Sequence, residues 1–152
     1  MTSDINEKAK VIFNDGGYPI PIEQRPLWRL GLMCLCIHYL GSNTYGLSLI
    51  KLKLATWMLI REQDWPYYNE VLNDLSLKPN FFKDDSYTER TIELGMVKKF
   101  FMFEGKNLKL LECGHSLISL SLELGLFKSE IEFLNTIKTK FTDSFVNRVM
   151  GW

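Results

Sequence analysis

The chain has 152 residues and a mass of 17.8 kDa, which is the length of one domain and enough to bury a core without disulfides or a structural metal. Hydrophobic residues make up 46% and charged residues 24% of the sequence, which excludes a disordered chain. The 18 Lys and Arg balance the 18 Asp and Glu, so the zero formal charge excludes a protein that binds nucleic acid through bulk positive charge. Little long-range repulsion keeps such a chain monomeric, and with 13% aromatic residues this favours a subunit of an assembly.

Residues 1–24 are predicted to form an extended N-terminal arm. A turn signal at residues 14–17 precedes a segment in which Pro19 and Pro21 favour extended backbone in the residues before them. The alternating side chains can form a short edge strand or lie across a partner. The candidate partner-binding residues of the arm are therefore Tyr18, Ile20 and Ile22.

Residues 25–152 are predicted to fold as one mainly α domain. The segment 25–39 reads as a helix with Pro26 in its first turn, and it is apolar on almost every side, so we expect it at the centre of the core. The next segment, 45–61, fits helical spacing and partly fits a strand. Its length favours a helix.

Two more helices are predicted before the hairpin. Asp64 can cap a helix whose apolar face is formed by Tyr68, Val71, Leu72 and Leu75, and which stops before Pro79. Residues 84–86 offer a cap for a short helix that runs to Leu94, with Gly95 as its C-terminal end.

A β-hairpin is predicted next, with strands in 96–103 and 108–111 around a turn at 104–107. Three helices follow it. The first covers 116–124, the second begins with a capping box from Ser129 to Glu132, and the last is capped by Thr142. The fold class is therefore mainly α with one small β-hairpin.

Helices followed by a hairpin are the order of a winged helix-turn-helix domain, in which a recognition helix enters the major groove and the hairpin contacts the DNA backbone. The hairpin segment carries four lysines and one acidic residue, Glu104. The lysines indicate either a surface that contacts DNA phosphates or, alternatively, a solvated hairpin whose charges keep its edges from pairing with other strands. The candidate DNA-binding residues are Lys98, Lys99, Lys106 and Lys109.

The start of the first helix is a second candidate for partner binding. Arg25 and Arg29 lie four residues apart beside Trp28, and Arg and Trp are enriched at interface hot spots. The alternative is a helix start with Trp28 in the core.

Patterns typical of a metal site or an enzyme are lacking. Cys34 and Cys36 lie in an apolar run and are expected to be buried thiols, and His38 and His115 do not have zinc-ligand spacing. Ser116 beside His115 has no carboxylate placed to complete a triad. We expect no enzyme activity and no cofactor.

The N-terminus lacks the basic and apolar regions of a signal peptide, and the longest apolar run, 30–40, is far shorter than the roughly 20 residues that span a bilayer. The three cysteines are an odd number, which does not favour a disulfide framework. We expect a reduced, cytoplasmic protein without a membrane segment.

Three segments carry a resemblance to a known family: the entry PIEQRPLWR at 21–29, the helix LIKLKLATW at 49–57, and the hairpin and helix at 95–122. Together, over residues 20–125, they resemble the middle components of bacterial ABC-three-component systems, which include the Lamassu anti-phage systems. The resemblance implies a non-enzymatic winged-helix-like subunit that sits with an ABC ATPase of the structural-maintenance-of-chromosomes (SMC) type and an effector, often a nuclease.

Two functions from different classes follow. The first is a scaffold or regulatory subunit of such a defence complex, with double-stranded DNA as a further partner through the complex. The second is a stand-alone winged-helix transcription regulator.

Overall fold

The computed structural model describes residues 25–152, so the predicted arm with Tyr18, Ile20 and Ile22 lies outside the described residues. The described part is mainly helical with one small antiparallel sheet, as predicted. In chain order the elements are α2 (Pro26–Leu40), β1 (Leu47–Ser48), α3 (Leu49–Ile60), the short 3-10 helix η2 (Glu62–Asp64), α4 (Trp65–Asn73), α5 (Ser86–Val97), β2 (Phe101–Glu104), β3 (Asn107–Leu110), α6 (Glu112–Leu124), α7 (Lys128–Ile137) and α8 (Asp143–Met150).

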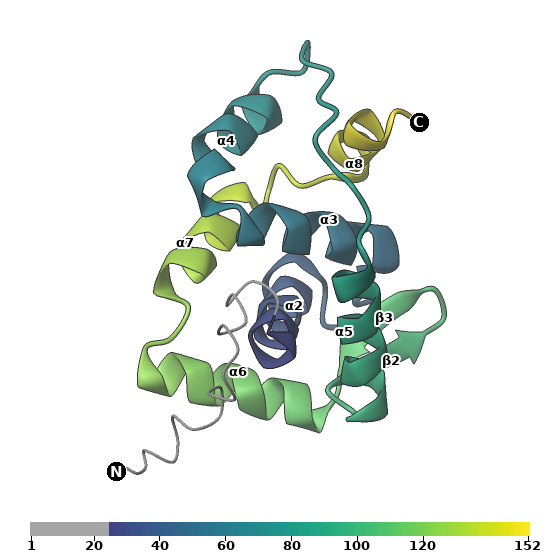
Figure 1. The fold of residues 1–152 in the computed structure, drawn as a ribbon, viewed down its shortest axis with the longest axis vertical. Coiled ribbons are helices and arrows are strands. Elements are labelled where there is room, and N and C mark those ends of the chain that lie inside the picture. Colours follow the sequence, from purple (N-terminus) through teal and green to yellow (C-terminus); the bar gives the residue numbers. More distant parts are fainter. Residues whose placement is uncertain (1–24) are drawn as a thin grey trace, which may run out of the picture.

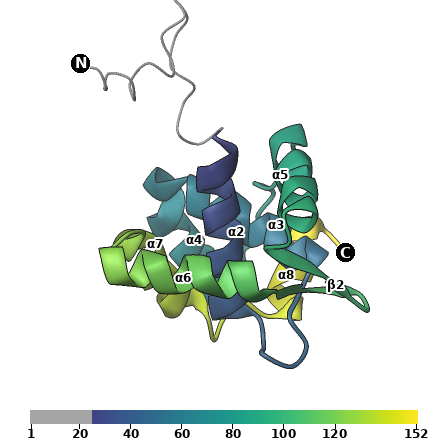
Figure 2. The ribbon, with the colours of Figure 1, turned by 90° about the horizontal axis from the view of Figure 1, so that it is seen from below.

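Helix α2 is the centre of the domain. It packs against α3, α5, α6 and α7, and Figures 1 and 2 show it enclosed by these helices. Every residue from Arg29 to Ile37 is buried, because the helix is apolar on almost all sides and therefore has no face suited to water. The prediction of a central helix is confirmed.

The sheet has three strands in the order β1-β3-β2. The predicted hairpin is present, with Phe101 opposite Leu110 and Glu104 opposite Asn107. The predicted helix over residues 45–61 is wrong in its first part, because Leu47 pairs with Leu108 as a short third strand. Ser48 then caps α3, and its hydroxyl accepts a hydrogen bond from the Lys51 amide at 3.3 Å.

Helix α5 runs through Gly95, which was predicted to end it, and continues to Val97. Gly95 is needed for packing, because a Cβ atom there would lie 2.3 Å from Cζ of Phe101. The ring of Phe101, which is fully buried, thus rests against the helix backbone and ties the hairpin to α5.

Other helix boundaries also differ from those predicted. Helix α6 begins at Glu112 rather than at residue 116. Helix α7 begins at Lys128, directly after Phe127, which has a left-handed φ of 59°. Ser129 therefore lies inside α7 and does not cap it. Asp64 makes no side-chain capping bond, and Leu75 is 76% exposed just beyond the end of α4. By contrast, Thr142 caps α8 as predicted, with its hydroxyl 3.2 Å from the Phe145 amide.

The order of the elements is the one expected of a winged helix-turn-helix-like domain: α5 precedes the β2–β3 hairpin in the chain, as the recognition helix precedes the wing. Helix α4 and residues 74–85 intervene between α3 and α5, so the connection between these two helices is long.

Candidate functional site

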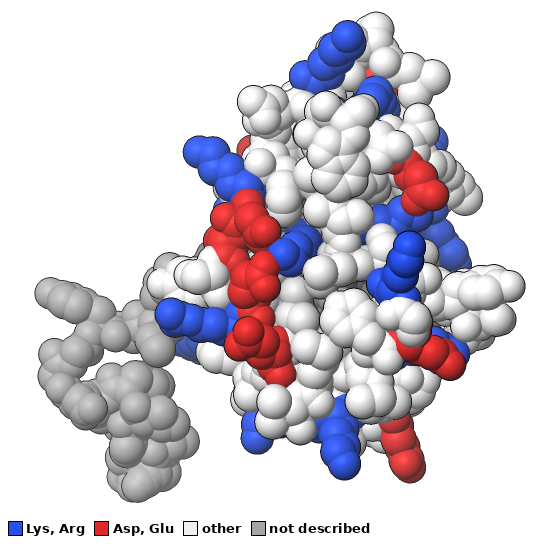
Figure 3. Space-filling view, turned by 90° about the vertical axis from the view of Figure 1, so that its right-hand side faces the viewer, with Lys and Arg blue, Asp and Glu red and all other residues white. Residues whose placement is uncertain are grey.

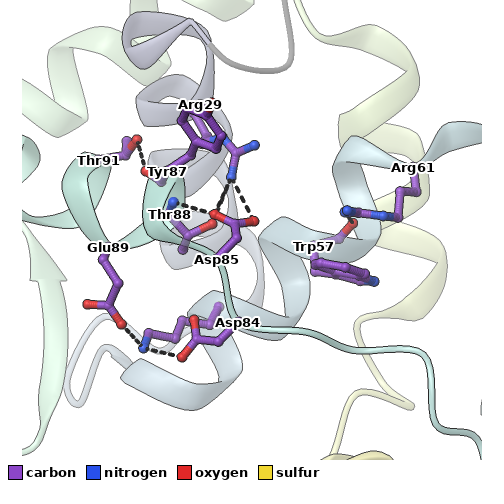
Figure 4. A network of polar contacts seen from close by, with 10 residues as sticks. Arg29, Trp57, Arg61, Asp84, Asp85, Tyr87, Thr88, Glu89 and Thr91 are labelled. Carbon is purple, nitrogen blue, oxygen red and sulfur yellow. Dashed lines mark hydrogen bonds and ion pairs between the residues drawn. The ribbon is translucent and has the colours of Figure 1, made fainter.

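Arg29, predicted as a partner-binding residue, lies inside the domain. Its side chain is held by the carboxylate of Asp85, 3.3 Å from Nη1, and by the Thr88 hydroxyl, 2.7 Å from the same nitrogen (Figure 4). Arg29 is only 5% exposed, so this guanidinium is part of the contact between α2 and α5. The spacing of Arg25 and Arg29 gave no sign of this, because the partners of Arg29 lie more than fifty residues along the chain.

Asp85 performs two tasks at the start of α5. It accepts a hydrogen bond from the Thr88 amide at 2.7 Å as the helix cap, and it pairs with Arg29. Burial by itself raises the pKa of Asp85, but the Thr88 amide and the positive charge of Arg29 outweigh it, so the pKa lies below its ordinary value. The carboxylate is thus fixed in its charged form.

A second set of ion pairs connects α5 to α3. The Lys53 ammonium binds the carboxylate of Asp84 at 3.1 Å and also that of Glu89 (Figure 4). The Lys53 side chain is largely covered, whereas both acidic partners are about half exposed. These contacts orient α5 on the core.

The other two residues of the predicted helix entry remain near the surface. Arg25 is exposed just before α2, and Trp28 is half-buried and packs against the core. Trp28 therefore matches in part the alternative of a core residue, and of the three predicted residues Arg25 alone is exposed.

The hairpin lysines divide into two kinds. Lys98, Lys99 and Lys106 are exposed. Lys109 is half-buried, and its ammonium lies 2.8 Å from the carboxylate of Glu104 on the neighbouring strand, which neutralises it locally. Three of the four candidate DNA-binding lysines therefore present an exposed charge.

Helix α5 carries charges of both signs on its outer side. Glu89, Arg90 and Glu93 are exposed on α5, and Asp84 is exposed just before the helix. Figure 3 shows Asp and Glu side chains in a column, with Lys and Arg side chains beside it, on the side of the molecule that carries α5 and the hairpin. Because Lys53 binds Asp84 and Glu89, these charges are partly compensated, and α5 does not present the cationic surface that attracts DNA phosphates.

Several leucines of α6 and of the turn after it are exposed, and sequence reasoning missed them. We call the pair Leu120 (51% exposed) and Leu124 (61%), which lie one turn apart on the same side of α6, the leucine surface. Leu122 (51%) lies on the other side of the helix, and Leu126 (47%) follows its end. A groove of about 430 Å³, lined in part by Phe100, Leu117 and Leu120, adjoins it. The one available signal was the run of leucines at 117–126, which has no single helical period and so cannot be covered by one core.

The cysteines differ in their surroundings. Burial raises the pKa of both the Cys34 and Cys36 thiols to about 12, so they stay protonated inside α2, as expected of buried thiols. Cys113 is exposed at the start of α6. Within residues 25–152 there is no group of three or more His, Cys, Asp or Glu side chains that could hold a metal ion.

No helix in the described part of the chain is long and apolar enough to cross a lipid bilayer. Comparison with known proteins adds no relative: no protein-family model, no curated protein and no solved structure matches the chain.

Proposed function

We propose that this chain is a non-catalytic scaffold or regulatory subunit that works by binding other proteins. Its proposed place is in a defence complex of the ABC-three-component type, where it links an SMC-like ATPase to an effector nuclease. The observation that carries the proposal is the leucine surface on α6. The family resemblance over residues 20–125 supplies the identity of the partners.

The leucine surface costs free energy while it faces water. Full burial of a leucine side chain contributes about 1.5–3 kcal/mol, and Leu120 and Leu124 are each roughly half exposed, so a partner that covers both gains about 1.5–3 kcal/mol. Exposed apolar patches beside a groove on soluble proteins mark sites of interaction. Leu120 and Leu124 are therefore candidate anchors for a protein partner.

The alternative is a stand-alone winged-helix transcription regulator. The element order and the exposed Lys98, Lys99 and Lys106 favour it. The lack of a cationic surface on α5, the helix that would read DNA, counts against it. The scaffold proposal needs no major-groove contact by α5, and it accommodates the hairpin lysines as a contact to DNA backbone within the complex.

The test is co-purification with the product of a neighbouring SMC-like ATPase gene. The double variant Leu120→Ser and Leu124→Ser is expected to lose at least tenfold in capture of the ATPase, which corresponds to about 1.4 kcal/mol. The matched control is Leu75→Ser: Leu75 is the most exposed of these leucines and follows α4, which lies at the opposite end of the molecule from α6 (Figure 1).

Circular dichroism of the isolated variants checks that each remains folded. Equal capture by the wild type, the α6 variant and the Leu75 variant would remove the leucine surface from the proposal. If the wild-type chain alone binds a specific DNA duplex at nanomolar affinity and captures no neighbouring gene product, the regulator takes the place of the scaffold.

A further inference from the structure

A small cavity of about 330 Å³ lies between the C-terminal turn of α2, the loop 41–46, strand β3 and the first turns of α6. It shares Leu110 and His115 with a neighbouring groove along α6, and none of its lining residues belongs to the polar network of α5. Its lining residues are Ile37, His38, Ser42, Asn43, Gly46, Lys109, Leu110 and His115.

Basic groups from three different elements meet at this cavity: His38 from α2, Lys109 from β3 and His115 from α6. None of the described residues that line it is Asp or Glu. Carboxylates adjoin the cavity in Glu104, which pairs with Lys109 at 2.8 Å, and in Glu112 and Glu123, which with His115 line the neighbouring groove of α6.

Protonation of His38 is disfavoured at this cavity. The pKa of His38 is lowered by burial and then by the neighbouring His115 and Lys138, so the added proton is opposed by other basic groups. An anion bound beside His38 would offset that repulsion and favour the protonated form of its imidazole. The ends of α2 and α6 contribute partial charges of opposite sign, so attraction for an anion rests on the side chains.

Neutral hydrogen-bond donors also line the cavity. The Asn43 amide and the Ser42 hydroxyl both line the cavity, and the Ser42 oxygen accepts a hydrogen bond from the Tyr45 amide at 2.7 Å, which leaves its own proton to donate. Paired backbone hydrogen bonds between Ser42 and Gly46 hold this loop closed. Several donors around a cationic centre are what a phosphate group, with its acceptor oxygens, requires.

We propose that this cavity binds a phosphate group, held by His38 and His115 with Ser42 and Asn43 as hydrogen-bond donors, and with the Lys109 ammonium shared between the phosphate and Glu104. The phosphate is either a terminal group, as in a free nucleotide, or an internal phosphodiester of nucleic acid. The proposal goes beyond the proposed function, since it concerns an anion site at the start of α6 and makes no use of a protein partner.

The experiment is a proton NMR titration of the imidazoles of His38 and His115 in the full chain, with inorganic phosphate against sodium chloride at matched ionic strength. Phosphate is expected to raise both pKa values by about one unit, since a site that prefers the protonated imidazole tenfold produces that shift. Shifts no larger than those in chloride would overturn the proposal.

Two variants make the result specific. His115→Gln, at an exposed position, is expected to weaken phosphate binding about tenfold and to abolish the response of His38. Lys128→Gln removes an exposed cation from the start of α7 and is the matched control, expected to bind phosphate like the wild type. Equal affinity in all three proteins would show binding to diffuse charge and would contradict the site.

Two further probes distinguish the source of the phosphate. A response to inorganic phosphate and to a 5′-phosphorylated dinucleotide assigns the site to terminal phosphate groups. A response of the same imidazoles to an unphosphorylated DNA duplex assigns it to the phosphodiester backbone. Either response, when lost in His115→Gln and kept in Lys128→Gln, supports the site.

Discussion

The carboxylate of Asp85 caps α5 and also neutralises Arg29, which is buried in α2: Oδ1 lies 2.7 Å from the Thr88 amide and 3.3 Å from Nη1 of Arg29. One side chain thus sets where α5 begins and how it sits on the central helix. The orientation of α5 decides the position of the hairpin, because Phe101 at the start of β2 packs on Gly95.

We expect Asp85→Ala to destabilise the domain by about 2–4 kcal/mol, because it removes a helix cap and a carboxylate that binds the buried Arg29 guanidinium. Asp85→Asn keeps an oxygen for the Thr88 amide and should lose about half as much. Denaturant unfolding measures both. The control is Asp84→Asn, whose exposed pair with Lys53 is worth less than about 1 kcal/mol; an equal loss in the control would contradict the special role of Asp85.

The free energy of unfolding is expected to decrease at acid pH because of the titration of Asp85. The pKa of Asp85 is lower in the folded protein than its ordinary value, so its stabilisation is fully present above about pH 4 and is lost as the pH falls through the folded-state pKa. The unfolding free energy of the wild type should therefore drop more steeply below about pH 4 than that of Asp85→Asn. Parallel curves for the two proteins would show that another carboxylate dominates.

Gly95→Ala should destabilise the domain although alanine is the better helix former. The new methyl group would meet the Phe101 ring at 2.3 Å and a Leu30 methyl at 2.9 Å, and such overpacking costs about 1–3 kcal/mol, more than the roughly 1 kcal/mol gained in helix propensity. Thermal unfolding tests this against Ser119→Ala at an exposed position of α6, which should be neutral or slightly stabilising. A raised Tm for Gly95→Ala would show that the ring is free to move.

Thiol reactivity should separate the three cysteines. Cys113 is exposed, whereas burial keeps Cys34 and Cys36 protonated with pKa values of about 12. In the native protein at about pH 8 we expect one thiol to react with an aromatic disulfide reagent, and all three after denaturation. Fast reaction of more than one thiol in the native state would show that α2 opens readily.

If the assembled complex binds DNA, the hairpin lysines should contribute unequally. Replacement of Lys98, Lys99 and Lys106 by Glu is expected to weaken binding at every sequence alike and to flatten the salt slope by roughly 0.9 per lost phosphate contact. Lys109→Gln should have a smaller effect, because Glu104 already neutralises that charge. Unchanged affinity in the triple variant would leave the hairpin a structural role.

The sequence predicted the features that depend on local pattern. The helix around Leu30–Ile37, the hairpin and the Thr142 cap follow from apolar spacing, turn residues and capping chemistry over a few positions. What could not be predicted depends on distant contacts. The burial of Arg29 requires Asp85, and the pairing of Leu47 requires Leu108, both more than fifty residues along the chain.

The candidate surfaces follow the same division. Lysine positions are visible in the sequence, but the neutralisation of Lys109 depends on strand register, which places Glu104 within reach. The leucine surface could not be separated from the core by pattern, because Ile118 of the same helix is buried while Leu120 and Leu124 are exposed. Only the packing of α6 on α2 distinguishes them.

The burial of α2 on all sides has a consequence during synthesis on the ribosome. This helix is complete at Leu40, but α7, which covers one of its sides, is complete only at Ile137. At about 5–20 residues per second, translation leaves that side of the buried helix uncovered for roughly 5–20 s. We therefore expect the soluble yield of the protein to rise when a holding chaperone is co-expressed.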